Sequence, residues 1–158
     1  MKKIFIIYGV LVFVVIALLI WRFASFDFNL NLLGIKATAK IDNQTIDLLV
    51  ADTEEELIKG LSGKRSLKEN EGMLFIFDQK GYPTFWMKEM NFALDIIYLN
   101  DSKVVHIVKN AQPIDKNTSN VTTYSPDEEA NHVLEVNAGT VDRLKITEGS
   151  TITFEGIE

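Results

Sequence analysis

The sequence predicts a mainly β domain preceded by one N-terminal transmembrane helix. Short apolar runs separated by Gly, Pro, Asn and Asp recur through residues 35–158, a pattern typical of strands joined by tight turns. Only two short segments carry helix signals, and no alternation of strands and helices is apparent. We therefore expect mainly antiparallel strands in a β-sandwich, a jelly-roll-like fold or a partly closed barrel, with two short helices covering its open ends.

The N-terminal segment predicts the membrane helix. Ile4 to Trp21 contains 18 residues without a charge, and as a helix it spans about 27 Å, close to the ~30 Å hydrocarbon core of a bilayer. Lys2 and Lys3 precede it and Arg22 follows it, which places the N-terminus in the cytoplasm by the positive-inside rule. The alternative is a cleaved signal peptide, but these have shorter apolar cores and a small-x-small cleavage site.

These signals divide the chain into three parts. We expect residues 1–22 to be the membrane anchor, residues 23–34 a tether, and residues 35–158 an extracytoplasmic domain. The chain contacts the membrane, on this interpretation, through residues 4–21.

Composition excludes several classes of partner and cofactor. The 158 residues include no cysteine and two histidines, so disulfides and thiolate metal sites are excluded and a His-rich metal centre is disfavoured. Without the three basic residues of the anchor, 13 basic residues face 22 acidic ones, a net charge of −9. Such a domain repels phosphate backbones, and nucleic acid is a poor partner. We expect no metal and no cofactor.

Five elements are predicted in the first half of the domain. Residues 35–41 and 45–50 flank Asp42-Asn43-Gln44 as a hairpin. Thr53 and Glu56 match a capping box, which predicts a helix over residues 54–59 that ends at Gly60. Two apolar runs, residues 73–77 and 84–88, are predicted as strands buried on both faces, with a turn at 79–83.

The second half is predicted in the same way. Residues 94–99 and 103–108 form a hairpin, and residues 133–136 and 151–154 form two further strands. Thr140 caps a short helix that ends near residue 144. The polar segment 111–131 is a long loop, of the kind used for binding or left mobile.

These residues resemble the DUF192 family, also called UPF0127, from about residue 52 to residue 154. The matching positions are Gly60-Leu61, Arg65, Leu67, Gly72-Met73-Leu74-Phe75, Phe85-Trp86-Met87-Lys88, Leu94-Asp95-Ile96, Pro113, Tyr124, Pro126 and Val133-Leu134-Glu135-Val136-Asn137-Ala138-Gly139. The resemblance implies a compact β-sandwich-like domain, often behind an export signal or anchor, with no established activity. The chain departs from the family pattern at Ser62, Glu89-Met90 and Ala93, where members usually have Met, Asn-Thr and Pro.

Alternation along the strands suggests a binding patch. Trp86 and Lys88 share one face of their strand, and Glu135 shares a face with Val133 and Asn137. One hypothesis brings together Arg65, Trp86, Lys88, Asp95, Glu135 and Asn137 in a concave patch that binds a sugar or a cell-wall fragment, with the indole stacked on the sugar ring. The alternative is that Trp86 fills the core and Lys88 pairs with Asp95.

Two other functions remain open. Asp95 and Glu135 are a possible acid/base pair of a glycosidase-like hydrolase, although no G-x-S-x-G, P-loop or H-E-x-x-H motif occurs. The segment 111–131 is a possible docking loop for an envelope protein, with Tyr124 as its anchor, unless Tyr124 only fastens the loop to the core. We favour a binding module without catalysis.

Overall fold

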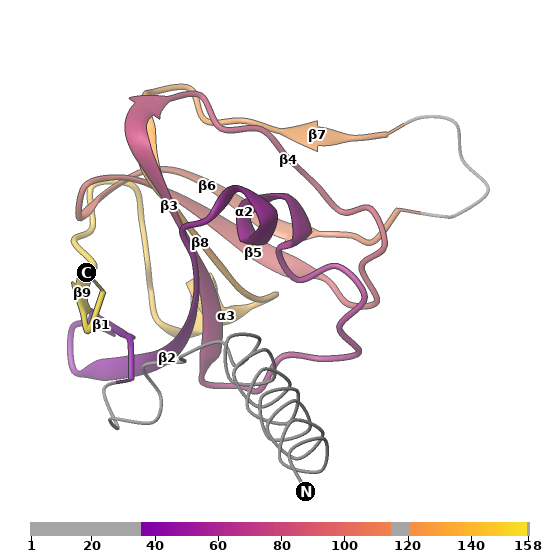
Figure 1. Cartoon of the computed structure of the whole chain (residues 1–158). Helices are drawn as coiled ribbons and strands as arrows, with labels where there is room; N and C mark the ends of the chain where they lie inside the picture. The colour runs from indigo at the N-terminus through magenta and orange to yellow at the C-terminus, as the bar shows by residue number, and fades with distance from the viewer. Residues whose placement is uncertain (1–35, 115–120, 158) are drawn as a thin grey trace, which may run out of the picture. The chain divides into compact units, whose positions relative to one another are not determined.

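The computed structural model describes residues 36–114 and 121–157 (Figure 1). The predicted anchor, residues 1–22, and the predicted tether, residues 23–34, lie outside these ranges. Among the described residues, no helix has both the length and the apolar character needed to cross a bilayer.

The described chain forms one seven-stranded sheet and one two-stranded ribbon. The sheet has the order β6-β5-β8-β3-β2-β1-β9, and the ribbon consists of β4 and β7. The strands of the sheet are β1 (Thr38–Ile41), β2 (Gln44–Ala51), β3 (Glu71–Gly81), β5 (Leu94–Asn100), β6 (Lys103–Ala111), β8 (Ala130–Asn137) and β9 (Thr153–Glu155), and the ribbon strands are β4 (Phe85–Trp86) and β7 (Thr123–Tyr124). The mainly β prediction and both predicted hairpins are confirmed.

The expectation of mainly antiparallel strands is confirmed, and one pair of the described strands is parallel. β2 and β3 run parallel, joined by a crossover that contains helix α2 (Glu54–Lys59). A parallel pair requires such a crossover, because a tight turn can only reverse the chain. The sequence gives no clear sign of this unit, because a helix of six residues is too short to produce a periodic signal.

The sheet curls into a half-barrel. Beyond the sheet order, the start of β6 bonds to the segment before β9: the Val104 N–H donates to the Ser150 carbonyl at 2.9 Å, and the Ile152 N–H donates to the Ser102 carbonyl at 2.8 Å. These bonds bring the two ends of the sheet together. Of the three architectures expected, the partly closed barrel is correct, and the two-sheet sandwich and the jelly roll are wrong.

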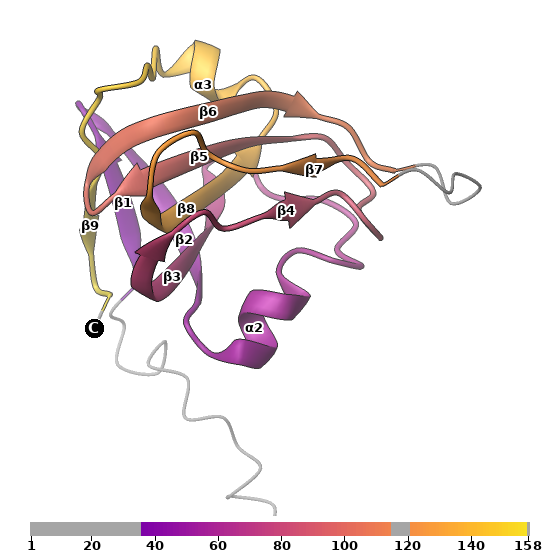
Figure 2. The same ribbon diagram turned by 90° about the horizontal axis from the view of Figure 1, so that it is seen from above.

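Each face of the sheet buries its own apolar cluster. The inner cluster includes Ile97, Leu134 and Val136 and is covered by helix α3 (Thr140–Arg143), whose Val141 is fully buried in it. The outer cluster includes Phe75, Ile96 and Tyr98 and is covered by α2 and the β4–β7 ribbon. Figure 2 shows α3 on one side of the sheet and α2 on the other.

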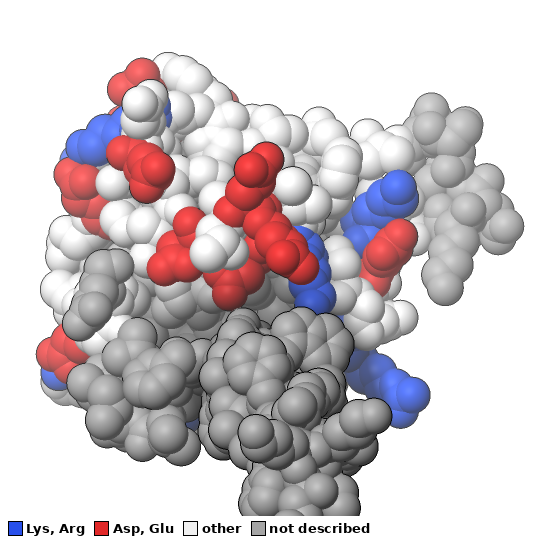
Figure 3. Space-filling view, viewed as in Figure 1, with Lys and Arg blue, Asp and Glu red and all other residues white. Residues whose placement is uncertain are grey.

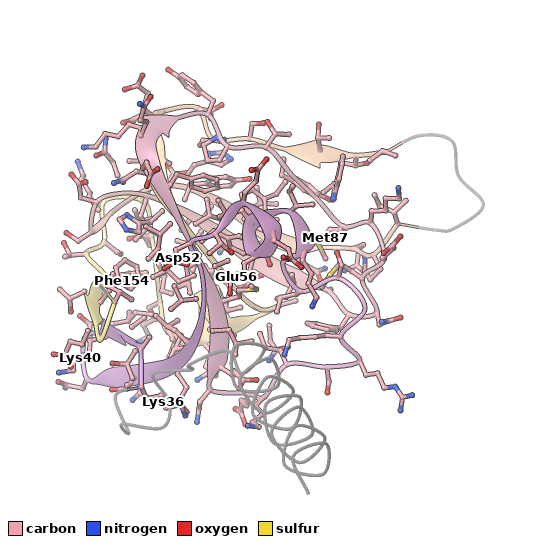
Figure 4. All side chains as sticks on the ribbon, in the orientation of Figure 1. Lys36, Lys40, Asp52, Glu56, Met87 and Phe154 are labelled. Atoms are coloured by element: carbon pink, nitrogen blue, oxygen red, sulfur yellow. The ribbon has the colours of Figure 1, made fainter. Side chains whose placement is uncertain are left out.

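Helix α2 begins where the capping box predicts. The Glu56 N–H donates to the Thr53 hydroxyl at 3.4 Å, and the Thr53 N–H donates back to the Glu56 carboxylate at 3.2 Å. Figure 4 labels Glu56 and Asp52 beside this helix. The contact with Thr53 lowers the pKa of the Glu56 carboxyl, since a hydrogen bond to the charged form favours it.

The second apolar run is not a core strand. Met73–Phe75 is buried on both faces, as predicted, but the run 84–88 contributes only the short β4, which pairs with β7 and not with the sheet. Its inner face holds Phe85 and the fully buried Met87, labelled in Figure 4. Its outer face is open, with Trp86 54% exposed.

Candidate functional site

A pocket of ≈ 330 Å³ opens between α2, β3 and β4 on the side of the outer cluster. This volume is at the lower end of the roughly 300–1,000 Å³ range of ligand pockets. Its lining is mostly apolar and aromatic, with a few polar groups. The lining residues are Leu57, Ile58, Lys59, Gly60, Leu61, Ser62, Phe75, Phe77, Pro83, Thr84, Phe85, Trp86, Met90 and Glu135.

The end of α2 forms one wall because a glycine ends the helix there. Gly60 has φ +48°, and a Cβ at this position would lie 3.1 Å from Cζ of Phe75. A residue without a side chain therefore lets the helix end lie directly against the Phe75 ring. This contact holds Leu61 and Ser62 at the pocket.

The opposite wall is fixed by edge-to-face aromatic contacts. The Phe85 ring lies 4.9 Å from Phe75, 6.5 Å from Phe77 and 6.1 Å from Tyr98, measured between ring centroids. Such pairs contribute about 0.5–1.5 kcal/mol each beyond their buried area. They fasten β4 over the outer cluster, and this leaves its neighbour Trp86 directed outward at the pocket.

Within the part of the chain that the structure describes, Glu135 is the one acidic residue that lines the pocket. It is 5% exposed, and its strand register places it beside Met73 and Ile96 on the outer-cluster face. Among the described residues, no hydrogen bond or ion pair reaches its carboxyl group. Burial alone raises the pKa of Glu135 to about 8, because an apolar environment disfavours the charged form.

Asp95 lies on the other face of the sheet. In the β5–β8 register Asp95 pairs with Val136, and Glu135 pairs with Ile96, the next residue of β5. The Asp95 carboxylate accepts the Asn110 N–H and the Val141 N–H, both at 2.9 Å. The second bond caps α3, whose N-cap residue Gly139 has no side chain to do so.

The predicted pairing of Asp95 with Glu135 is therefore wrong. Successive side chains in a strand point to opposite faces, and the register brings Glu135 level with Ile96, not with Asp95. The acid/base pair of the hydrolase hypothesis cannot form across the sheet. The alternative of a Lys88–Asp95 ion pair is also wrong in the described chain, since Asp95 is occupied by backbone donors.

Three other predicted residues lie away from the pocket lining. Lys88 and Arg65 are exposed. Asn137 donates its side-chain amide to the carbonyls of Leu67 and Lys68, at 3.1 and 2.9 Å, so it fastens the crossover loop to the sheet. The predicted concave patch is thus reduced to Trp86 and Glu135.

Tyr124 fastens the long segment to the core. It pairs with Phe85 in the ribbon and packs against the outer cluster. Its carbonyl accepts the Tyr98 hydroxyl at 2.9 Å. The centre of the predicted docking loop, residues 115–120, lies outside the described residues.

The sequence hypothesis missed most of the pocket lining. The apolar runs predict core strands that contain Phe75, Phe77 and Phe85, and the helix over residues 54–59 is expected only to cover an open end of the fold. The available signal was the glycine-terminated helix beside an aromatic run, but no local pattern shows that the two segments meet. Within the described chain, no group of three His, Asp or Glu side chains is arranged to hold a metal ion.

Acidic side chains gather on the surface over α2, in the middle of Figure 3. The first turn of the helix supplies Glu54, Glu55 and Glu56. The last turn carries Lys59, an exposed residue at the pocket.

Comparisons with known proteins agree on the fold. The profile of the DUF192 family, described as "Uncharacterized ACR", matches residues 36–154. A solved protein of unknown function from Novosphingobium aromaticivorans is 30% identical, with a TM-score of 0.66 over 75% of this chain and 83% of its own. A candidate transcription regulator from Sinorhizobium meliloti is 25% identical, with a TM-score of 0.67 over 77% of this chain and 94% of its own. A search of curated proteins found no match.

Proposed function

The chain belongs to the DUF192 family of uncharacterised proteins, and from this premise we propose that its domain is a non-catalytic module that binds a sugar ring. The supporting observation is the pocket itself: an open indole, Trp86, stands at a cavity that contains one buried carboxyl group, Glu135. An indole stacks on the C–H face of a sugar, and a carboxyl group bonds to its polar substituents.

The pocket favours a small ligand over a protein partner. Its volume of ≈ 330 Å³ lies within the range of small-molecule pockets. The residue predicted to anchor a partner, Tyr124, is used inside the domain instead.

The positions of the carboxyl groups disfavour the glycosidase-like alternative. Glycoside hydrolysis generally needs two carboxyl groups on the two sides of the scissile bond. Among the described residues, the pocket lining contains one, Glu135, and Asp95 is on the opposite face of the sheet.

We further propose that the module is held at the outer side of a membrane by residues 4–21. The support is the uncharged stretch with its lysine flank. An envelope glycan is then the sugar that the pocket would meet. Protease added to intact cells should degrade the C-terminal domain, and a domain that stays protected until the cells are lysed would refute this location.

Binding can be tested with the full-length chain in detergent micelles. The probes are three β-1,4-linked disaccharides: cellobiose, the disaccharide of N-acetylglucosamine and the disaccharide of glucosamine. We expect calorimetric titration to detect at least one of them, and Trp86→Ala to weaken that binding by about tenfold, the equivalent of about 1.4 kcal/mol.

The matched control is Tyr82→Ala. Tyr82 is also an exposed aromatic residue, 60% exposed and four positions from Trp86, but it is not among the residues that line the pocket. Its substitution should leave the dissociation constant within about twofold. Equal effects of the two substitutions, or no binding of any probe, would refute the sugar site.

A further inference from the structure

We infer that the sugar bound in this pocket carries a free amino group, and that its positive charge lies against the carboxyl group of Glu135. This inference rests on the proposed sugar site and specifies the ligand class. It predicts a preference for amino sugars without an acetyl group over both neutral and N-acetylated sugars.

Glu135 lacks the partner that a buried carboxyl group normally has. It is 95% buried, since its exposed fraction is 5%, and no described side chain or backbone N–H bonds to its carboxyl group. In the described chain, the one fully enclosed polar side-chain atom without a hydrogen-bond partner is Nδ1 of His132. The carboxyl oxygens of Glu135 also lack a partner but are not fully enclosed, so they have some access to the pocket that Glu135 lines.

An ammonium group would supply what is missing. It donates charge-assisted hydrogen bonds to a carboxylate, which are roughly twice as strong as neutral ones. Burial alone raises the pKa of Glu135, so no cation of the protein compensates this group. The exposed Lys59 lies at the pocket, but it makes no ion pair with Glu135 in the described structure.

The aromatic walls suit the same cation. Phe75, Phe77 and Phe85 meet edge to face, and Trp86 completes an aromatic lining on this side. A cation over an aromatic ring gains about 0.5–2 kcal/mol, most with Trp and in desolvated positions. A neutral hydroxyl group would gain neither this attraction nor the ion pair.

The surface around the pocket is negatively charged, opposite in sign to an ammonium group. Acidic side chains gather over α2, which forms one wall (Figure 3), and the full chain has a net charge of −6. A negative surface raises the local concentration of cations and disfavours anionic ligands.

Binding of the cation should displace the proton from Glu135. At pH 7 a carboxyl group with a pKa of about 8 is mostly protonated. An adjacent positive charge lowers its pKa, so the complex contains the carboxylate. Titrations in buffers of different ionisation enthalpy should therefore show net proton release with the glucosamine disaccharide and none with cellobiose.

The decisive comparison uses the three disaccharides with the wild-type, full-length chain, so it requires no variant. The glucosamine disaccharide should bind at least about tenfold more tightly than the other two. Glu135→Gln, which keeps the side-chain shape, should remove this preference. Glu54→Gln, which removes an exposed acid of α2, should retain the preference.

The outcomes separate this inference from the sugar site. Binding of cellobiose or of the N-acetylated disaccharide that depends on Trp86, without preference for the amine, refutes the inference and retains the proposed function. A preference for the amine that survives Glu135→Gln also refutes the inference. No binding of any disaccharide refutes both.

Discussion

Replacement of Glu135 by glutamine should stabilise the domain, and the gain should grow as the pH rises. The unfolded chain releases the Glu135 proton near pH 4.5, and the folded chain holds it until about pH 8. Between these values the folded state binds one proton more than the unfolded state, so stability falls as the pH rises. Below pH 4.5 Glu135 is protonated in both states and its burial carries no charge penalty. Above pH 8 it is ionised in both states, and the folded state bears the full free-energy cost of the buried charge.

The size of the effect follows from the two pKa values. The interval from 4.5 to about 8, at 1.36 kcal/mol per pH unit, corresponds to up to about 5 kcal/mol. At pH 7 the free energy of unfolding of the wild type should be about 3 kcal/mol lower than below pH 4.5. Glutamine does not ionise, so Glu135→Gln should avoid the loss.

Urea unfolding of the full-length chain, followed by far-UV circular dichroism at several pH values from 5 to 8, measures the difference directly. The control is Glu69→Gln, which removes a carboxyl group from an exposed loop position and should follow the wild type. A difference between wild type and Glu135→Gln that is the same at pH 5 and pH 8 would show that burial does not disfavour the charged form of Glu135.

Three further predictions concern the framework of the pocket and are measured by the same urea unfolding. Asp95→Asn should lower the free energy of unfolding by about 2–4 kcal/mol, because it places an amide N–H₂ against one of two backbone N–H donors. The control is Asp142→Asn, at an exposed ion pair with Lys109, which should lower it by less than about 1 kcal/mol. Equal losses for the two variants would contradict the capping role of Asp95. Gly72→Ala should cost about 1–3 kcal/mol, because its Cβ would lie 3.0 Å from the Glu135 carbonyl oxygen and 3.1 Å from Leu134 and Val136 side-chain carbons. Gly81→Ala, with no atom within 4 Å of the new Cβ, is its control, and a neutral Gly72→Ala would show that this close approach is relieved at no cost. Thr53→Ala should cost about 1 kcal/mol through loss of the α2 cap, whereas an unchanged midpoint would show that packing alone holds the helix.

Local signals predicted the elements well where one short segment decides the outcome. The Thr53–Glu56 capping box and Gly60 fixed both ends of α2, and the Asp42-Asn43 turn fixed the first hairpin. Phe85 and Met87 point inward and Trp86 and Lys88 outward, as alternation in a strand requires. Where two distant segments decide, prediction failed: β4 has the apolar run of a core strand, yet it pairs with β7 outside the sheet.

The sequence by itself determined that Glu135 and Asp95 are acids within apolar strands, and which neighbours share a face with each along its own strand. Only the tertiary structure decided which faces align. The β5–β8 register places Ile96 opposite Glu135, and a slip of one residue would have put Asp95 there instead. That register depends on the packing of the two apolar clusters and on α3, whose Val141 N–H bonds to Asp95. The paired residues of β5 and β8 lie far apart in the chain, from Leu99–His132 to Leu94–Asn137, beyond the reach of any local pattern.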